Sequence, residues 1–437
     1  MALGGGVFTT TNEILPGSYI NIVSKARKTS LLGERGVVAI VLPLDWGNGG
    51  VIKLTSNQFY TESLRILGFS SDANNDNMRV LREIFRNASE VVIYNSNSNS
   101  TKASASASNG VTAAVGGTRG NDLAVTFTTN SVDATKMDVV TKLGTTVVSA
   151  QTIVANSERP ASNAWVTFPS SFSVPEGGTT YSFTGGAAGS AVDVETALEA
   201  LSQEDFNVLC AYTSSEQGDY ITFTETQRDV VGKKFQCVVY NTPSANHEGI
   251  ISVSNAVSET PTHALVAWVA GAEAGCAVNK AITNKIYDGE LTVTCNETQS
   301  ELATALESGK LIFHKVAGDV RVLEDINTYT DNTVEKNGEF GYNQTIRVID
   351  QIANDISTLF NTKYIGSIAN NAAGRVSLWN DIVKHHKELE TIEAIENFDS
   401  AEVVVSPHPT DKRAVIVNDA VVVVNCMTKM YMTLYIS

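Results

Sequence analysis

The sequence predicts an α/β core that is interrupted by an all-β insert and followed by a smaller α+β unit, with a strand-forming segment near each end. Three observations predict this order. Apolar strands alternate with amphipathic helices on both sides of residues 96–189. That middle stretch is rich in Ser, Thr, Gly and Ala and alternates with the period of a strand. Two long helical patterns precede short apolar strands near the C-terminus.

The α/β core is predicted from residues 36–95 together with residues 190–330. Its first half begins with the buried strand GVVAIVL, continues through the helices SNQFYTESLRILG and DNMRVLREIFRN, and ends with the strand EVVIY. Ser56 is the expected N-cap of the first helix, and Gly68 is its expected stop. Beyond the insert, helices such as VETALEALSQ alternate with strands such as FNVLCAYT. This alternation favours a mainly parallel sheet with helices on both faces.

Residues 96–189 form the predicted insert. The Asn/Ser/Ala-rich linker NSNSNSTKASASASNG leads into short alternating strands that include LAVTFTTN, MDVVTKL and TTVVSAQTIV. Because the α/β pattern resumes after this stretch, we interpret it as a small all-β domain inserted into the core.

Residues 331–417 are predicted to form a separate α+β unit. The segments NQTIRVIDQIANDISTLFNT and GRVSLWNDIVKHHKELETIEAI repeat apolar residues at intervals of three and four, which is typical of helices with one buried face. The apolar strands AEVVVSP and KRAVIV follow them. We therefore expect two helices on a small sheet.

The N-terminal segment, residues 1–35, is predicted to be an arm and a tether. A turn at Pro16-Gly17 precedes a short strand, and the polar stretch from Ser24 to Arg35 lacks sustained periodicity. The strand residues are Tyr19, Ile20, Asn21, Ile22 and Val23.

The C-terminal segment, residues 418–437, is predicted to be a second strand arm. Its strand residues are Val421, Val422, Val423, Val424, Met430, Met432, Leu434 and Ile436. Only the charge of Lys429 would discourage other chains from pairing with such an apolar edge strand. The segment is therefore either an inner strand of its own sheet or a strand added to another chain. One strand near each end can link copies head to tail, and such a contact generates a helical filament if it does not close.

Charge and apolar content exclude several classes of function. A net charge of -16 argues against a nucleic-acid coat and against a carrier onto anionic membranes, because both need clustered Lys and Arg. The N-terminus lacks a signal-peptide pattern, and no apolar run reaches the roughly 18 residues of a membrane span. We therefore expect a protein made in the cytosol, without direct membrane insertion. The five cysteines lie far apart, outside CxxC spacing, and are interpreted as reduced and mostly buried.

A search for catalytic and ligand-binding patterns predicts no enzyme activity, no cofactor and no metal site. Phosphate-binding loops and the GxSxG elbow are absent. HEGII resembles the start of a zinc-protease motif, but Ile251 stands where the second histidine belongs. His386 and Glu390 have the spacing of a helical metal pair; the alternative is that His386 is packed and His385 is solvated. A Ser/His/Asp triad stays open, because its members meet only in three dimensions.

Four stretches resemble contractile tail sheath proteins of myophage-type tails and related phage-tail-like bacteriocins, in the branch found in Gram-positive bacteria and their phages. The stretches are LPGSYINIVSKA, VGGTRGNDLAV, GKLIFHKVAGDVRVLEDINTYT and SPHPTDKRAVIVNDAVVVVNCMTKMYMTLYIS. They are spread over nearly the whole chain. The most specific pattern combines Gly318 and Val322 with the run Asp325-Ile326-Asn327-Thr328.

The resemblance implies a subtilisin-like core without protease activity, a β-sandwich insert and a C-terminal domain that faces a tail tube. It also implies that the arms of neighbouring subunits add strands to a third subunit's C-terminal domain. The implied function is that of a structural sheath subunit, which polymerises helically around the tube and contracts to drive it through a cell envelope. The implied partners are copies of itself, the tail tube protein, and baseplate and tail terminator proteins. The implied location is a virion or phage-tail-like particle, assembled in the bacterial cytoplasm and released by lysis.

Contact with the tube is expected to need few, polar interactions. The cationic candidates in this acidic chain are Arg375, Lys384, His385 and Lys387, with ordinary solvated helix surface as the alternative. Two other functions stay open at this stage. One is a static self-assembling tube or surface-layer protein, and the other is a hydrolase with an accessory β domain.

Overall fold

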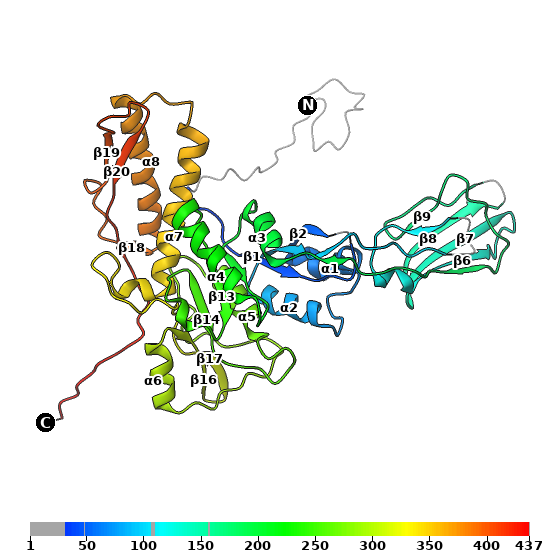
Figure 1. Ribbon diagram of the computed structural model, residues 1–437, viewed down its shortest axis with the longest axis horizontal. Coiled ribbons are helices and arrows are strands. Elements are labelled where there is room, and N and C mark those ends of the chain that lie inside the picture. The colour runs from blue at the N-terminus through cyan, green and yellow to red at the C-terminus, as the bar shows by residue number, and fades with distance from the viewer. Residues whose placement is uncertain (1–30, 48, 106–109, 156–157, 437) are drawn as a thin grey trace, which may run out of the picture.

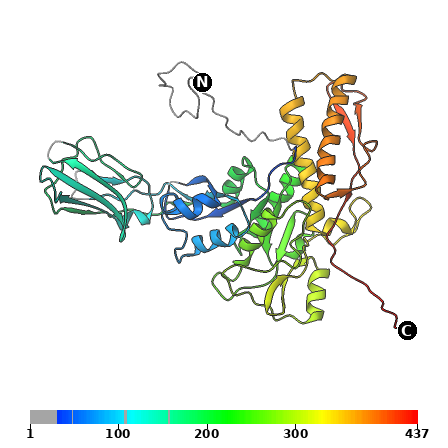
Figure 2. The same cartoon turned by 180° about the vertical axis from the view of Figure 1, so that it is seen from behind.

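The computed structural model describes residues 31–47, 49–105, 110–155 and 158–436. The α/β core lies in the middle, with the β insert at one end and a pair of long helices at the other (Figure 1). Seen from behind, the order is the same, and the C-terminal segment leaves the body as an extended stretch of chain (Figure 2). The predicted strand from Tyr19 to Val23 lies outside the described residues.

A seven-stranded sheet in the order β15-β14-β13-β12-β1-β3-β2 forms the core. Its strands are β1 (Val37–Leu42), β2 (Gly50–Thr55), β3 (Glu90–Asn95), β12 (Val208–Cys210), β13 (Gln236–Tyr240), β14 (Ile250–Val253) and β15 (Lys310–Leu311). Neighbouring strands pair in parallel, except that β2 runs antiparallel to β3. The prediction of a mainly parallel sheet is confirmed.

Helices cover both faces of this sheet. They are α1 (Ser56–Leu67), α2 (Asp76–Phe85), α3 (Val194–Ser202), α4 (Gln217–Glu225), α5 (Leu265–Gly275) and α6 (Gln299–Glu307). Alternate residues of β1 point to opposite faces: Val38 and Ile40 belong to the cluster with α2 and α5, and Ala39 to the cluster with α3 and α4. Both faces are therefore buried, which explains why the strands are apolar throughout.

The N-cap of helix α1 lies one residue earlier than predicted, and the helix begins at Ser56. The N-cap is Thr55, not Ser56, because the Thr55 hydroxyl accepts the Gln58 N–H while the Gln58 side chain accepts the Thr55 N–H. Gly68 ends the helix as predicted, with a φ of 79° that favours glycine.

The hairpin of β16 (Phe313–Val316) and β17 (Asp319–Val322) explains two residues of the most specific sequence pattern. Its turn residues Ala317 and Gly318 have φ of 51° and 98°, and the second of these positions suits glycine. Val322 is fully buried in the core. Short helical turns complete the backbone: η1 (Thr118–Asp122), η3 (Pro243–Ala245) and η4 (Gly338–Gly341) are 3-10 turns, and η2 (Thr226–Val231) and η5 (Phe360–Tyr364) are π turns.

The insert is a β domain with its own aromatic core. Its strands are β4 (Asn97–Ser98), β5 (Thr112–Ala113), β6 (Leu123–Thr129), β7 (Lys136–Leu143), β8 (Thr146–Val154), β9 (Val166–Thr167), β10 (Thr180–Ser182) and β11 (Ser190–Ala191). Its largest sheet has four strands in the order β10-β6-β7-β8. Its first and last strands, β4 and β11, pair where the insert joins the core. Trp46 of the core packs 5.6 Å from Trp165 of the insert, so the two cores meet at this point.

The C-terminal unit contains the helices α7 (Asn343–Leu359) and α8 (Ala372–Thr391), as predicted. Instead of one small sheet, two separate antiparallel pairs accompany them. β18 (Ile395–Glu396) pairs with β21 (Val422–Val423), and β19 (Val404–Pro407) pairs with β20 (Val415–Asn418). In the described part of the chain no helix is long and apolar enough to span a membrane.

Candidate assembly surfaces

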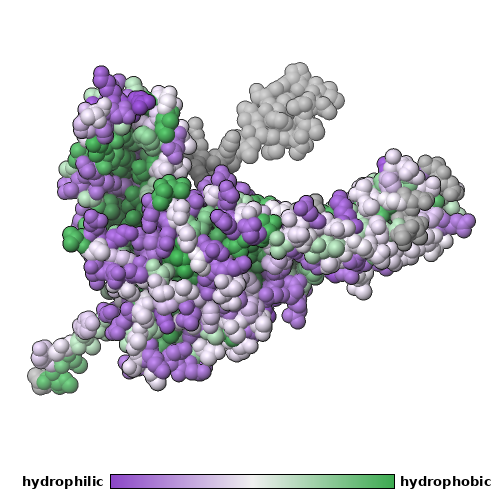
Figure 3. Space-filling view, in the orientation of Figure 1, coloured by the Kyte–Doolittle hydropathy of each residue, from purple (hydrophilic) through white to green (hydrophobic). Residues whose placement is uncertain are grey.

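Large apolar side chains are exposed on the C-terminal unit and on the segment that leaves it. They include Val404, Ile416, Val417 and Val422 on the small strands, and Met427, Met430, Tyr431, Met432, Leu434, Tyr435 and Ile436 beyond them. Figure 3 shows apolar surface at the tip of the C-terminal segment and in a hollow of the C-terminal unit. Exposed apolar surface of this extent marks places that another chain covers.

Residues 427–436, which we call the free arm, carry no secondary structure. Met430 is 82% exposed and Ile436 90%. The chain is anchored just before the free arm, where the Cys426 N–H donates to Gln344 Oε1 at 2.9 Å. Of the two sequence alternatives, an inner strand of the chain's own sheet is therefore wrong for the free-arm residues Met430, Met432, Leu434 and Ile436.

The first half of the predicted C-terminal arm is held by its own chain. Val422 and Val423 form β21 beside β18, and the Val424 N–H donates to Ala394 O at 3.0 Å. Val421 and Val423 pack against the buried cluster between α7 and α8. In this chain these valines complete the C-terminal unit, whereas the described residues of the free arm pair with no strand.

Both small sheets leave strand edges open. Each contains two strands, and the structure places no third strand beside either of them within the described ranges. Two-stranded ribbons are marginally stable in water unless further strands or packing support them. Their outer edges carry backbone N–H and C=O groups that an added strand can pair with.

Arg347 on α7 joins the C-terminal unit to the core through a buried charge cluster. Its Nη2 donates to Glu273 Oε2 at 2.5 Å and to Asp325 Oδ2 at 3.2 Å, and its side chain is fully buried. Asn343 Nδ2 donates to Glu273 Oε1 at 3.2 Å and to Asp325 Oδ1 at 2.8 Å. Asp325 begins the Asp-Ile-Asn-Thr run, so this run has a structural reason: it holds α7 against the core.

The pKa values of the two carboxyl groups around Arg347 are shifted in opposite directions. Burial, together with the charge of Asp325, raises the pKa of Glu273 well above its usual range. Burial also acts on Asp325, but the charge of Arg347 outweighs it with the help of several hydrogen bonds, and the pKa of Asp325 is lowered. The cluster therefore favours the protonated form of Glu273 and the ionised form of Asp325 beside Arg347.

The variant Glu273→Gln should flatten the pH dependence of stability, because its amide imitates the protonated acid. In the wild type, the folded state keeps the Glu273 proton while the unfolded state releases it above about pH 4.3, so stability falls as the pH rises from there toward the higher folded pKa. Urea unfolding across this range measures the slope. The exposed Glu307→Gln is the control and should keep the wild-type slope. A Glu273→Gln slope equal to the wild type would contradict the assignment.

Further buried contacts fasten the core to the C-terminal unit. Arg228 forms a bidentate pair with Asp350 on α7, at 2.6 and 2.9 Å. Asn327 Nδ2 of the core donates to Phe340 O of the C-terminal unit at 2.9 Å, while within the core Thr328 Oγ1 donates to His247 O at 3.0 Å. These contacts add to the Arg347 cluster, so we expect the core and α7 to move together.

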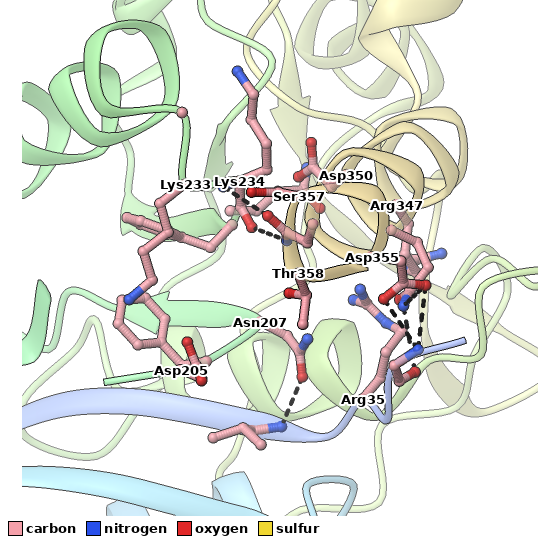
Figure 4. A pocket seen from close by; sticks show the side chains of 18 of the residues that line it. Arg35, Asp205, Asn207, Lys233, Lys234, Arg347, Asp350, Asp355, Ser357 and Thr358 are labelled. Carbon is pink, nitrogen blue, oxygen red and sulfur yellow. Dashed lines mark hydrogen bonds between the residues drawn. The ribbon is translucent and has the colours of Figure 1, made fainter. Parts of the chain in front are cut away.

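A polar cleft of about 520 Å³ lies between the core and α7. Figure 4 shows Arg35, Arg347 and Asp355 at one end of it, and Lys233 with Asp205 at the other. Its cations already have partners. Arg35 Nε donates to Cys276 O at 3.3 Å, and Lys233 Nζ donates to Ser202 O at 2.9 Å. Burial, with the nearby charge of Arg347, lowers the pKa of Arg35 to about 10. The cleft therefore does not offer these cations to an anionic ligand.

The described end of the predicted tether is bound rather than free. The Leu31 N–H donates to Glu388 Oε2 at 2.8 Å, and the Gly33 N–H donates to Asp355 Oδ1 at 3.1 Å. The prediction of a tether is therefore wrong for residues 31–35, since their backbone is fixed on α7 and α8.

The four cationic candidates for a tube contact do not share one surface. His385 is 1% exposed, because it lies between α7 and α8, and the prediction that it is solvated is wrong. Lys384 and Lys387 are exposed. Arg375 precedes Lys384 by nine residues, which at about 100° per residue places it on the opposite side of α8. It instead lines an apolar groove of about 470 Å³.

Three residues come close enough to suggest a metal site, but their hydrogen bonds argue against one. Asp229, His247 and Glu248 place ligand atoms within 4.8 Å of one another. His247 Nδ1 accepts the Gly249 N–H at 2.9 Å, so a neutral ring carries its proton on Nε2, which faces Asp229. Lys336 Nζ already lies 2.7 Å from Glu248. The predicted alternative of a metal shared by His386 and Glu390 is also wrong, since Glu390 accepts the Phe398 N–H while His386 faces Asp419.

The core and the C-terminal unit are joined by buried ion pairs, two small sheets have open edges, and an apolar arm is exposed. These features are typical of a structural protein that assembles with other chains. Comparisons with known proteins identify which one. Family models described as the phage tail sheath protein beta-sandwich domain, the phage tail sheath protein central domain and the phage tail sheath C-terminal domain match residues 98–203, 187–328 and 335–437.

Whole-length relatives agree with these matches. The phage-like element PBSX protein XkdK of Bacillus subtilis is 30% identical over 468 residues, which cover 98% of this chain and 99% of that protein. The crystal structure of a sheath tail protein from Desulfitobacterium hafniense is 30% identical, has a TM-score of 0.74, and covers 93% of this chain and 100% of its own. The contracted helical sheath of the anti-feeding prophage, at 14% identity and a TM-score of 0.56, shares the fold over 98% of this chain and 99% of its own.

This chain belongs to the phage tail sheath proteins. It is a structural subunit of a contractile tail sheath, found in a phage tail or a phage-tail-like particle. The family and its structural neighbours are structural sheath proteins, and the β-sandwich domain expected from the sequence is one of the family's domains.

Proposed function

We propose that subunits of this sheath are linked by exchanged terminal strands. The free arm, residues 427–436, adds to a small sheet in the C-terminal unit of a neighbouring subunit, and the segment from Tyr19 to Val23 contributes a second strand. The observation that carries this proposal is the exposure of the free arm's apolar side chains next to sheets with open edges. The N-terminal strand lies outside the described residues and rests on its sequence pattern alone.

Exchanged strands suit a lattice that must rearrange without falling apart. Each backbone hydrogen bond contributes roughly 0.5–1.5 kcal/mol net, and burial of the apolar face adds to this. The links stay paired while the rigid cores rotate from an extended lattice to a wider and shorter one, and this contraction drives the tube through a cell envelope. A few kcal/mol per subunit is sufficient when many subunits change together.

The remaining expectations complete this proposal. The parts are the arm and tether (1–35, of which residues 31–35 are bound to α7 and α8), a subtilisin-like core without protease activity (36–95 and 190–330), the β insert (96–189), the C-terminal domain (331–417) and the C-terminal arm (418–437, of which Val421 to Val424 stay on their own chain). The partners are the tail tube, the baseplate and the tail terminator, and assembly takes place in the bacterial cytoplasm before release by lysis. Lys384 and Lys387, which are exposed on α8, are the cationic residues that we propose for tube contact.

Aspartate on one face of the free arm should weaken polymerisation, while aspartate on the other face should not. In an added strand, Met432 and Leu434 point to one side and Thr433 to the other. We expect the double variant Met432→Asp with Leu434→Asp to raise the concentration needed for polymerisation at least about tenfold, because two charges would be buried at the joint. Sedimentation of the assembled fraction measures this. Thr433→Asp is the matched control, and an equal effect of both variants would contradict strand addition.

A further inference from the structure

A row of four hydrogen-bonding side chains crosses the C-terminal unit between its two helices. His385 Nε2 lies 3.0 Å from Asp355 Oδ2 on α7, and His385 Nδ1 lies 3.1 Å from His386 Nδ1. His386 Nε2 in turn lies 2.7 Å from Asp419 Oδ2, in the link between β20 and β21. Both imidazole rings are buried.

The number of protons in this row follows from its three contacts. Each contact joins two atoms that act as acceptors unless one of them carries a proton, so each contact needs one proton, on whichever atom it resides. Two neutral imidazoles supply two protons. All three contacts are hydrogen bonds at once only when the row holds one proton more than two neutral rings and two carboxylates. With one proton fewer, one of the three contacts joins two acceptors, which repel each other. With one proton more, one contact joins two donors, which also repel each other.

The two ends of the row reach the roots of both arms. The Gly33 N–H donates to Asp355 Oδ1 at 3.1 Å and to Asp355 Oδ2 at 3.2 Å. Gly33 lies in residues 31–35, the part of the N-terminal segment that the structure describes. Asp419 lies three residues before β21, which begins at Val422, and eight residues before the free arm. A continuous set of hydrogen bonds thus connects the bound residues 31–33 with the start of the segment that leads through β21 to the free arm.

The polar groups around the two rings are engaged in hydrogen bonds of their own. The Phe398 ring packs 5.1 Å from the His386 ring and contributes no charge. On α8, Glu388 accepts the Leu31 N–H and Glu390 accepts the Phe398 N–H. On α7, Gln351 Nε2 donates to Asp355 Oδ2 at 2.8 Å. The remaining charged side chains of this stretch of α8 are Lys384 and Lys387, which are exposed.

We propose that Asp355, His385, His386 and Asp419 form a proton-sharing latch that couples the roots of the two arms. When the carboxylate at one end of the row moves away, the shared protons lose one of their acceptors. The hydrogen bond at the other end of the row then weakens. In the sheath, the latch holds the roots of both arms on their own C-terminal unit, while the arms themselves reach neighbouring subunits and the cores rotate. This role rests on the proposed strand exchange, but the latch itself exists in a single subunit and can be tested there.

The test is hydrogen–deuterium exchange of the full-length chain at concentrations where single subunits dominate. Asp419→Asn keeps the shape of the side chain but no longer balances the extra proton. We expect the Gly33 amide, at the far end of the row, to exchange about tenfold faster, as for a weakened hydrogen bond to a charged group. Reciprocally, Asp355→Asn should speed exchange of the Val424 amide by a similar factor.

Asp411→Asn is the matched control. It lies in the loop of the β19–β20 hairpin, where Asp411 accepts the Arg413 N–H outside the row, and it should leave the Gly33 amide unchanged. An unchanged Gly33 amide in Asp419→Asn would overturn the latch. So would an equal acceleration of β1 amides such as that of Ala39, since this would mean general destabilisation rather than coupling. Because no assembly is required, the strand exchange can fail in its own test without affecting this result.

Discussion

Subunits that lack residues 427–437 should no longer form tubes, although their thermal unfolding should match that of the intact chain. The described part of this segment is exposed and follows the last anchoring contact at Cys426, so its removal takes nothing from the subunit's own core. In the lattice it removes several backbone hydrogen bonds and one buried apolar face, about 5 kcal/mol per contact. Such a loss raises the polymerisation threshold more than about a thousandfold. Electron microscopy and sedimentation measure the outcome.

A matched variant separates the sequence of the free arm from its length. Replacing residues 427–436 with Gly and Ser in equal number keeps the reach of the segment but removes its apolar face and its strand preference. We expect this variant to fail like the truncation. Tubes that resemble those of the intact protein, from either variant, would show that the free arm is not the link.

Arg347→Ala should destabilise the subunit by about 3–5 kcal/mol, the largest effect that we expect from a single side chain here. The substitution leaves Asp325 buried and ionised without its partner, and it removes the main charged bridge between α7 and the core. Urea unfolding followed by circular dichroism measures the loss.

The exposed Arg413→Ala serves as the control for this loss. Arg413 pairs only with the neighbouring Asp411 at the surface, so its removal should change stability by less than about 0.5 kcal/mol. If Arg347→Ala were as mild as this control, the cluster would not be what joins the two parts of the molecule.

Much of the fold could be predicted from periodicity, because each buried element repeats its apolar residues with its own period. The parallel strands and the helices α7 and α8 were found in this way. Strand β2 was missed, since Gly50 and Lys53 weaken its strand pattern at the edge of the sheet. Helix α4 was missed because its β-branched residues favour strands and only Tyr220 and Thr224 are buried.

The assembly surfaces could be predicted only in part. Alternation in the C-terminal segment indicated a strand, but it could not show that Val421 to Val424 dock on their own chain while the free arm does not. His385 was assigned to solvent because a helical wheel shows the faces of α8 but not the neighbouring α7, whose Asp355 binds it. The Arg347 cluster was also out of reach, since Glu273 lies 74 residues away from Arg347 in sequence.

A cryo-electron microscopy reconstruction of the polymer, at a resolution that separates strands, tests the central claim most directly. Strand exchange predicts that residues 427–436 form a strand hydrogen-bonded to the C-terminal unit of a different subunit, on an edge of one of the two small sheets. A polymer in which these residues fold back onto their own subunit, or touch no sheet at all, would contradict it.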